Sequence, residues 1–325
     1  MTRILFSAPY MIPFLDRFQA IFDRYGMELI VPAVNERLEE SQILEYAGDF
    51  DATICGDDQY SAEVLKACQP RLKVISKWGT GIDSIDSQTA EELGIRVYRT
   101  ANAFTIPVAD TVLGYILAFA RRQPWMDRAI KSGLWEKLPG RSLGECTLGV
   151  IGVGNIGRAV LERAHAFNMK LIGNDIIEID PHFLRSLDIE MKSLPELLSQ
   201  ADFASINCDL NPSSYHLINE QSLKFMKPSA VLINTARGRV IDESALINAL
   251  HAGSIAGVAL DVFEVEPIPT GSPLLEMDNV MLAPHNANSS PAAWEHVHWN
   301  TIHNLLEGLE ISHDIEKLRY DDQAG

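Results

Sequence analysis

Four side chains that could exchange protons or hold an anion follow apolar segments in the second half of the chain. They are Arg237 in "INTARGRVID" (233–242), Asp261 and Glu266 in "GVALDVFEVEP" (257–267), and His285 in "LAPHNANSS" (282–290). A histidine at a strand end is more often a hydrogen-bonded structural residue than a catalyst. Ligands of an open parallel sheet, however, bind beyond the carboxyl ends of its strands. A guanidinium, two carboxylates and an imidazole at one such crevice therefore indicate a reaction centre.

A glycine-rich turn precedes these segments in "GVIGVGNIGRAV" (149–160), where Gly152, Gly154 and Gly157 form a G-x-G-x-x-G pattern. The triplet alone is weak evidence, but here it follows an apolar strand and opens a helix. Gly152 suits the tight turn, Gly154 the close approach of a pyrophosphate, and Gly157 close helix–strand packing. The backbone amides of Asn155 and Ile156, at the helix N-terminus, are expected to face the phosphates.

Asp175 follows Gly157 by eighteen residues and ends the next strand, "LIGND". A carboxylate there accepts both ribose hydroxyls of an adenosine and repels a 2′-phosphate. Ile176 and Ile177 follow it, rather than a cationic residue that would pair with such a phosphate. The sequence thus predicts NAD as the cofactor, and the competing interpretation is an aspartate that only caps a turn.

Taken together, these motifs resemble the D-isomer-specific 2-hydroxyacid dehydrogenases, including the phosphoglycerate dehydrogenase-like members. The resemblance covers nearly the whole chain and is strongest over 145–285; "KWGTGIDSID" (77–86) and "TANAFTIPVADT" (100–111) extend it to the first domain. It implies that Arg237 binds the substrate, that Glu266 pairs with His285, and that His285 moves the proton. The remaining implied contacts are to the cofactor from Cys208, Thr235, Ala236 and Asp261, and to the substrate from Gly79, Thr80, Gly81 and Asn288.

The reaction that the resemblance implies requires these residue types. Reducing a 2-keto acid places negative charge on the carbonyl oxygen as hydride arrives, so the site needs a proton donor and a fixed cation. A neighbouring carboxylate favours the imidazolium form of a histidine and orients its ring. The planar fork of an arginine can engage a carboxylate and a carbonyl together.

The chain departs from the family pattern after its histidine and in the loop after the third strand. Asn286, Asn288, Ser289 and Ser290 replace an apolar residue and small residues, which predicts a narrower or different choice of substrate. In "ICGDDQYS" (54–61), Asp57 and Asp58 stand where phosphoglycerate-specific members carry an arginine, which disfavours a phosphorylated substrate.

Short apolar runs alternate with amphipathic stretches twice along the chain, which predicts two doubly wound parallel-sheet α/β domains. We expect a Rossmann NAD-binding domain over 102–288, inserted into a flavodoxin-like substrate domain formed by 1–101 and 289–325. A helical pattern over 106–130, broken at Pro124, is predicted to form a hinge and part of a homodimer contact with Trp135; the alternative for Trp135 is core filling. The substrate is then expected between the domains, with closure on binding.

Composition narrows the classes of partner. The 325 residues carry a net charge of −17, which disfavours nucleic acid and anionic membrane surfaces, and no apolar run is long enough to span a bilayer. Cys55, Cys68, Cys146 and Cys208 have neither metal-ligand nor redox-pair spacing, so we expect no metal and a reducing, cytoplasmic location. An NAD-dependent dehydrogenase is the first hypothesis. The second is an NAD(H)-sensing binding protein of the corepressor type on the same scaffold.

Overall fold

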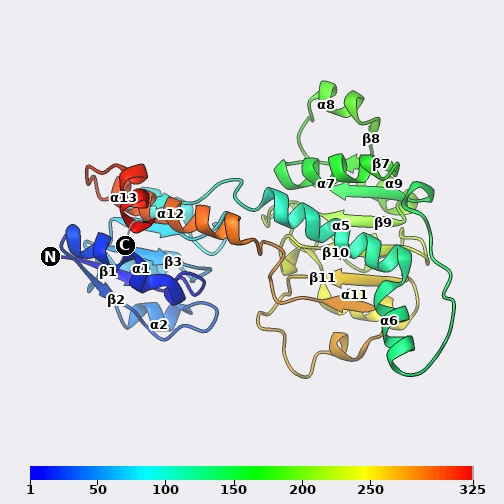
Figure 1. Ribbon diagram of the computed structural model, residues 1–325, viewed down its shortest axis with the longest axis horizontal. Helices are drawn as coiled ribbons and strands as arrows, with labels where there is room; N and C mark the ends of the chain where they lie inside the picture. Colours follow the sequence, from blue (N-terminus) through cyan, green and yellow to red (C-terminus); the bar gives the residue numbers. More distant parts are fainter. Residues whose placement is uncertain (324–325) are drawn as a thin grey trace. The chain divides into compact units, whose positions relative to one another are not determined.

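The computed structural model describes residues 1–323 and consists of two compact α/β units (Figure 1). The first unit comprises Met1–Ala103 and the segment that begins at Ser290; the second comprises Phe104–Ser289. The sequence-based boundaries fall after residues 101 and 288 instead. Within the described residues, no helix is both long enough and apolar enough to cross a membrane.

The first unit is built on a five-stranded parallel sheet with the order β2-β1-β3-β4-β5. This is the flavodoxin-like order, and it confirms the predicted fold. Its strands are β1 (Thr2–Phe6), β2 (Met27–Ile30), β3 (Ala52–Cys55), β4 (Val74–Lys77) and β5 (Arg96–Tyr98). Its helices are η1 (Ile12–Phe14), α1 (Leu15–Arg24), α2 (Glu40–Leu44), α3 (Ala62–Ala67), α4 (Ser87–Glu92), α12 (Pro291–Gly308) and α13 (Ile315–Gln323).

Helix α12, from the C-terminal part of the chain, covers the first sheet. It packs on β3, β4 and β5, and its Val297, Ile302 and Leu305 are completely buried. The Ser76 hydroxyl of β4 donates to the Thr301 carbonyl at 2.8 Å, which links the helix to the sheet. The apolar face of this helix therefore completes the core of a domain whose last strand, β5, ends at Tyr98, far earlier in the sequence.

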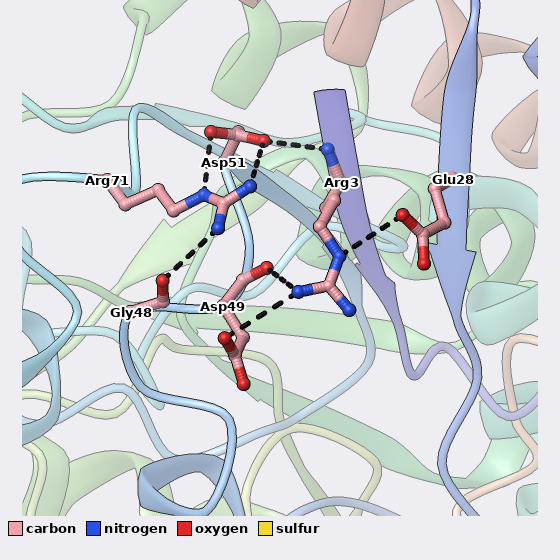
Figure 2. Close-up of polar contacts among 6 residues, drawn as sticks. All are labelled: Arg3, Glu28, Gly48, Asp49, Asp51 and Arg71. Atoms are coloured by element: carbon pink, nitrogen blue, oxygen red, sulfur yellow. Dashed lines mark hydrogen bonds and ion pairs between the residues drawn. The ribbon is translucent and has the colours of Figure 1, made fainter. Parts of the chain in front are cut away.

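A network of ion pairs joins the amino ends of the strands in the first unit (Figure 2). The Asp51 carboxylate, just before β3, accepts the Arg3 amide at 2.7 Å and two guanidinium bonds from Arg71 at 3.0 and 3.2 Å. Burial opposes ionisation of Asp51, but these bonds outweigh it and lower the pKa of the carboxyl. Arg3 also pairs with Glu28 of β2 at 3.3 Å. The network stabilises the amino end of the sheet, which is opposite to the loops that follow its strands.

The second unit is built on a seven-stranded parallel sheet with the order β12-β11-β10-β9-β6-β7-β8. The order reverses at β6, as in the Rossmann fold, which confirms the predicted class. Its strands are β6 (Thr147–Ile151), β7 (Lys170–Asn174), β8 (Ile189–Met191), β9 (Phe203–Ile206), β10 (Val231–Asn234), β11 (Gly257–Leu260) and β12 (Val280–Leu282). Its helices are α5 (Thr105–Arg121), α6 (Gln123–Lys131), η2 (Leu143–Glu145), α7 (Asn155–Ala166), α8 (Pro181–Ser186), α9 (Leu194–Gln200), α10 (Glu220–Leu223), η3 (Gly238–Val240), α11 (Glu243–His251) and η4 (Pro273–Glu276).

Helices cover both faces of the second sheet, and successive strand residues alternate between two cores. Leu171, for example, packs with α5 and α7, whereas its neighbour Ile172 packs on the opposite face with α9. Burial on both faces explains why these strands have continuous apolar sequences rather than alternating ones.

The helical pattern over 106–130 divides into α5 and α6 at Arg122, not at Pro124 as predicted. Arg122 has a left-handed φ of 56°, and Pro124 lies in the first turn of α6. The prediction was wrong because a proline is compatible with the first turn of a helix, where the missing amide has no intrahelical acceptor. Val112 and Ile116 of α5 are completely buried in the core of the second unit.

Candidate active site

The glycine-rich turn lies between β6 and α7 and leaves no room for larger residues at two of its three glycines. Gly152 has a φ of 90°, and a Cβ there would lie 2.6 Å from the amide nitrogen of Cys208. A Cβ on Gly157 would lie 2.0 Å from the Gly152 carbonyl oxygen. A Cβ on Gly154, in contrast, would meet no atom within 4 Å. Packing therefore does not explain Gly154, whereas a ligand approaching the backbone would.

Helix α7 begins at Asn155, with Gly154 as an N-cap that makes no side-chain capping bond. The first amides of a helix have no acceptor within it and carry the positive end of the helix dipole. Asn155, Ile156 and Gly157 thus supply the kind of backbone cradle that binds a pyrophosphate. The residues present fit a dinucleotide.

Asp175 lies directly after β7 and is hydrogen-bonded to the glycine-rich turn. One carboxylate oxygen accepts the Val153 amide at 2.7 Å, and the other accepts the Ile177 amide at 3.1 Å. The second bond is the turn cap that we considered as the alternative interpretation. The first bond is different, because it holds a negative charge beside the dinucleotide-binding turn. Ile176 and Ile177 are 82% and 65% exposed, so neither blocks access to this carboxylate.

Cys208 and Thr235 follow β9 and β10, at the carboxyl end of the sheet that also carries the glycine-rich turn. Burial raises the pKa of the Cys208 thiol to about 11, so this cysteine is protonated at neutral pH and is not a nucleophile. The Thr235 hydroxyl oxygen is buried and has no hydrogen-bond partner among the described residues. A buried polar atom that lacks a partner at a strand end indicates a ligand that would supply the missing hydrogen bond.

The turn that carries Arg237 is shaped by a side chain that the sequence analysis did not select. Asn234, completely buried at the end of β10, accepts the Ala236 amide at 3.0 Å and donates to the Arg237 carbonyl at 2.9 Å. The Arg237 guanidinium donates to the Ala236 carbonyl at 2.8 Å. The missed signal was a buried polar residue at the end of an otherwise apolar strand.

Gly238 joins the Arg237 turn to the loop that carries Glu266. A Cβ on Gly238 would lie 1.9 Å from the Phe263 carbonyl group, so the two backbones are in direct contact. Because β10 and β11 are neighbours in the sheet, this contact holds the Arg237 and Glu266 loops side by side.

His285 and Glu266 are hydrogen-bonded, with 2.9 Å between the imidazole Nδ1 and the Glu266 Oε2. The second carboxylate oxygen of Glu266 accepts the Phe263 amide at 2.9 Å, which fixes its orientation. The two side chains are 23% and 21% exposed, so the pair is shielded but reachable. A histidine held this way keeps one ring nitrogen on the carboxylate, and its other nitrogen, Nε2, is the one placed to exchange a proton.

Asp261 holds the segment that follows His285. Its two carboxylate oxygens accept the amides of Asn286 and Ala287 at 2.9 and 2.8 Å, and its carbonyl accepts the His285 amide at 2.7 Å. His285 has a φ of 51°, a conformation that is uncommon for residues other than glycine. Burial raises the pKa of Asp261, and the two amide bonds oppose that rise. The family resemblance implies a cofactor contact for Asp261, and the structure adds the positioning of His285. Asn288, next to this segment, is half-buried.

Gly79, Thr80 and Gly81 lie in the first unit, in the loop after β4. Gly79 has a φ of 122°, a conformation that side chains rarely adopt. Metal binding has no comparable basis: in residues 1–323, no group of three or more histidine, cysteine, aspartate or glutamate side chains could hold an ion.

Comparison with known proteins gives a family match over the second unit. Residues 113–287, more than half of the chain, match the model of the D-isomer specific 2-hydroxyacid dehydrogenase NAD-binding domain. A glyoxylate reductase of Thermofilum pendens is 41% identical over 83% of this chain and 81% of its own length. The chain belongs to the D-isomer specific 2-hydroxyacid dehydrogenase family.

Other members of the family extend the match in sequence and in structure. A hydroxypyruvate reductase of Thermotoga maritima is 36% identical over 85% of this chain and 90% of its own length. The crystal structure of an Aquifex aeolicus D-lactate dehydrogenase with NAD and lactic acid has a TM-score of 0.85, at 28% identity and with 95% and 96% of the two chains covered. This 2-hydroxyacid dehydrogenase is therefore an NAD-dependent oxidoreductase of 2-hydroxy and 2-keto acids. The alternative of a corepressor receives no support from these matches.

Proposed function

We propose that this dehydrogenase reduces a small, unphosphorylated 2-keto acid to the D-2-hydroxy acid with NADH, using His285 as the acid, Glu266 as its partner and Arg237 as the substrate-binding cation. The observation that carries this proposal is the 2.9 Å pair between His285 and Glu266 beside the Arg237 turn. A structural histidine would need only a hydrogen bond, whereas a proton donor needs an oriented ring and a carboxylate that stabilises its charged form.

In the reductive direction, bound NADH supplies the hydride that the carbonyl carbon receives. His285 donates its proton from Nε2 to the carbonyl oxygen while Glu266 stabilises the imidazolium through Nδ1. Arg237 binds the substrate carboxylate and keto oxygen and offsets the negative charge that develops on that oxygen. In the oxidative direction, His285 accepts the same proton.

For cofactor binding, we assign the pyrophosphate to the amides of Asn155 and Ile156, with Gly154 allowing its close approach, and the adenosine ribose to Asp175. The open space over Gly154 and the charge of Asp175 beside the turn support these two assignments. Further contacts along the dinucleotide are proposed for Cys208, Thr235, Ala236 and Asp261. The buried Thr235 hydroxyl, which lacks a partner among the described residues, supports this group.

For the substrate, we propose that the amides of Gly79, Thr80 and Gly81 bind the carboxylate and that Asn288 contacts the rest of the molecule. Glyoxylate and hydroxypyruvate are the first candidates, because they are the substrates in the names of two relatives. The loop after β3 presents the carboxylate of Asp57, which is 41% exposed, where a phosphate would need a cation, whereas Asp58 is completely buried. We therefore keep phosphorylated acids out of the proposal.

We further propose a homodimer located in the cytoplasm. Trp135 is 87% exposed, and Leu134 and Ile130 beside it are 52% and 51% exposed. Filling the core of its own chain is thus the wrong interpretation for Trp135, and an exposed apolar patch of this kind is typical of a subunit contact. Cys55, Cys68 and Cys146 are buried free thiols, as expected in a reducing compartment.

The test of the proposed function is NADH oxidation with glyoxylate, hydroxypyruvate, pyruvate and 3-phosphohydroxypyruvate under identical conditions. We expect rapid turnover of at least one of the first three acids, a far lower kcat/KM for the phosphorylated acid, and a D-configured product where the product is chiral. No turnover of any 2-keto acid, with NADH still bound, would contradict the proposal.

A further inference from the structure

Lys77 is the last residue of β4 and immediately precedes the loop that carries Gly79, Thr80 and Gly81. Its side chain is only 4% exposed, and its ammonium lies 2.9 Å from the Asp57 carboxylate. The same ammonium donates to the Trp78 carbonyl at 3.2 Å. A lysine is rarely buried without a specific partner, and here it has two: the carboxylate and a backbone carbonyl of the loop.

The other carbonyls of the loop are also held. The Gly79 carbonyl accepts the Thr100 amide at 2.8 Å, and the Thr80 carbonyl accepts the Arg99 guanidinium at 3.1 Å. The Thr80 hydroxyl donates to the Thr100 carbonyl at 2.8 Å, which restrains the loop further.

The amides of Gly79, Thr80 and Gly81 show the opposite pattern. None of the three donates a hydrogen bond to any residue in the range 1–323. Gly79 is buried, and Thr80 and Gly81 are half-buried. A loop whose Trp78, Gly79 and Thr80 carbonyls all accept hydrogen bonds, and whose next three amides donate to no described residue, is built to receive an anion.

The position of Lys77 gives it a direct influence on the first of these amides. The Trp78 carbonyl and the Gly79 amide belong to one planar trans peptide group, so they point in opposite directions. A cation held on the carbonyl fixes the direction of the N–H group and also polarises it, which strengthens the bond that the amide donates. Asp57 holds the lysine in this place and offsets part of its charge, so the loop acts through oriented amides.

We propose that Lys77 is a positioning residue for the substrate carboxylate, acting through the Trp78–Gly79 peptide group. The inference rests on the proposed function, because it concerns the residues that we assign to the carboxylate. Lys77 itself need not touch the substrate. Every 2-keto acid carries this carboxylate, so Lys77 contributes to affinity for the whole class and not to the choice among its members.

The test compares Lys77→Met with wild type by titrating oxamate, an unreactive 2-keto acid analogue, into the enzyme–NADH complex and by measuring kcat and KM for two keto acids. Losing a charged hydrogen bond should weaken oxamate binding roughly tenfold and raise KM by a similar factor for both acids. We expect kcat and the Kd of NADH to stay within twofold. Lys77→Arg, which keeps the charge, should recover most of the oxamate affinity.

The matched control is Arg71→Met, which breaks the pair with Asp51 at the amino end of the same sheet, whereas Lys77 lies at its carboxyl end (Figure 2). It removes a cation from an ion pair of similar length, 3.0 Å against 2.9 Å, and should leave oxamate binding unchanged. Lys77→Gln serves if the methionine variant does not fold, and it should also weaken oxamate binding because it lacks the charge.

Two results would overturn the role of Lys77 while leaving the proposed function standing. One is wild-type turnover of 2-keto acids together with less than a twofold change in oxamate affinity for both uncharged variants. The other is an equal loss of affinity in the Arg71→Met control. If wild type neither turned over a 2-keto acid nor bound oxamate, the proposed function itself would fail.

Discussion

Asp175 gives the sharpest prediction about cofactor choice, because its charge and its hydrogen bonds can be separated by substitution. If its carboxylate binds the ribose hydroxyls, a 2′-phosphate would place a second negative charge at roughly 4 Å. Two unit charges at that distance repel by about 1 kcal/mol in water and by about 4 kcal/mol near a protein surface. Since 1.4 kcal/mol is a tenfold change, the charge should favour NADH over NADPH by about fivefold to several hundredfold.

The perturbation is Asp175→Asn, with Asp175→Ala beside it. The asparagine keeps one acceptor for the Val153 amide, whereas the alanine loses the bonds to both Val153 and Ile177. The ratio of kcat/KM with NADH to kcat/KM with NADPH should fall at least fivefold in both variants, mainly through better use of NADPH in the asparagine variant. The alanine variant should also bind NADH less well. An unchanged ratio in the asparagine variant would remove Asp175 from the adenosine site.

Three further predictions concern the turn, a buried acid and the catalytic pair. Gly157→Ala should lower the melting temperature, because its Cβ would lie 2.0 Å from a backbone oxygen. Gly154→Ala should melt at the wild-type temperature but raise the Kd of NADH. Equal melting temperatures for the two variants would refute the packing argument. Burial raises the pKa of Asp58 to about 6 from 3.8, so the folded state favours the protonated carboxyl. The contribution of this group to the stability of the fold is complete below pH 3.8 and is lost as the pH rises through 6. The free energy of unfolding in urea should therefore be the same for Asp58→Asn and wild type near pH 3.8, and above pH 6 it should be larger for the variant by up to about 3 kcal/mol. A difference between the two proteins that does not change with pH would contradict this. Glu266→Gln should lower kcat by roughly tenfold to a hundredfold, the value of a charged hydrogen bond to His285, with an unchanged Kd for NADH; an unaltered kcat would exclude the pair from the reaction.

The fold and the places where polar side chains end the strands could be predicted from the sequence, because both depend on local patterns. Alternating apolar runs and helical stretches indicate parallel sheets, and the spacing from the glycine-rich turn to Asp175 identifies a dinucleotide-binding unit. The position of the helix break could not be read in the same way, since Pro124 is compatible with the start of α6.

Contacts between distant loops were beyond reach of the sequence. The bonds from Asn286 and Ala287 to Asp261 join residues 25 and 26 positions apart, and the contact of Gly238 with Phe263 joins two separate strand ends. No periodicity reports such backbone approaches. The burial of Lys77 beside Asp57 depends likewise on the neighbouring ends of β3 and β4.

The most direct test of the central claim is the rate of hydride transfer in a single turnover of His285→Ala, measured beside the Kd of NADH by fluorescence. If His285 is the proton donor, the rate should fall roughly a hundredfold to ten-thousandfold while NADH binds within a few-fold of wild type. A variant that transfers hydride at the wild-type rate and loses only stability would show that His285 is a structural histidine at the end of a strand.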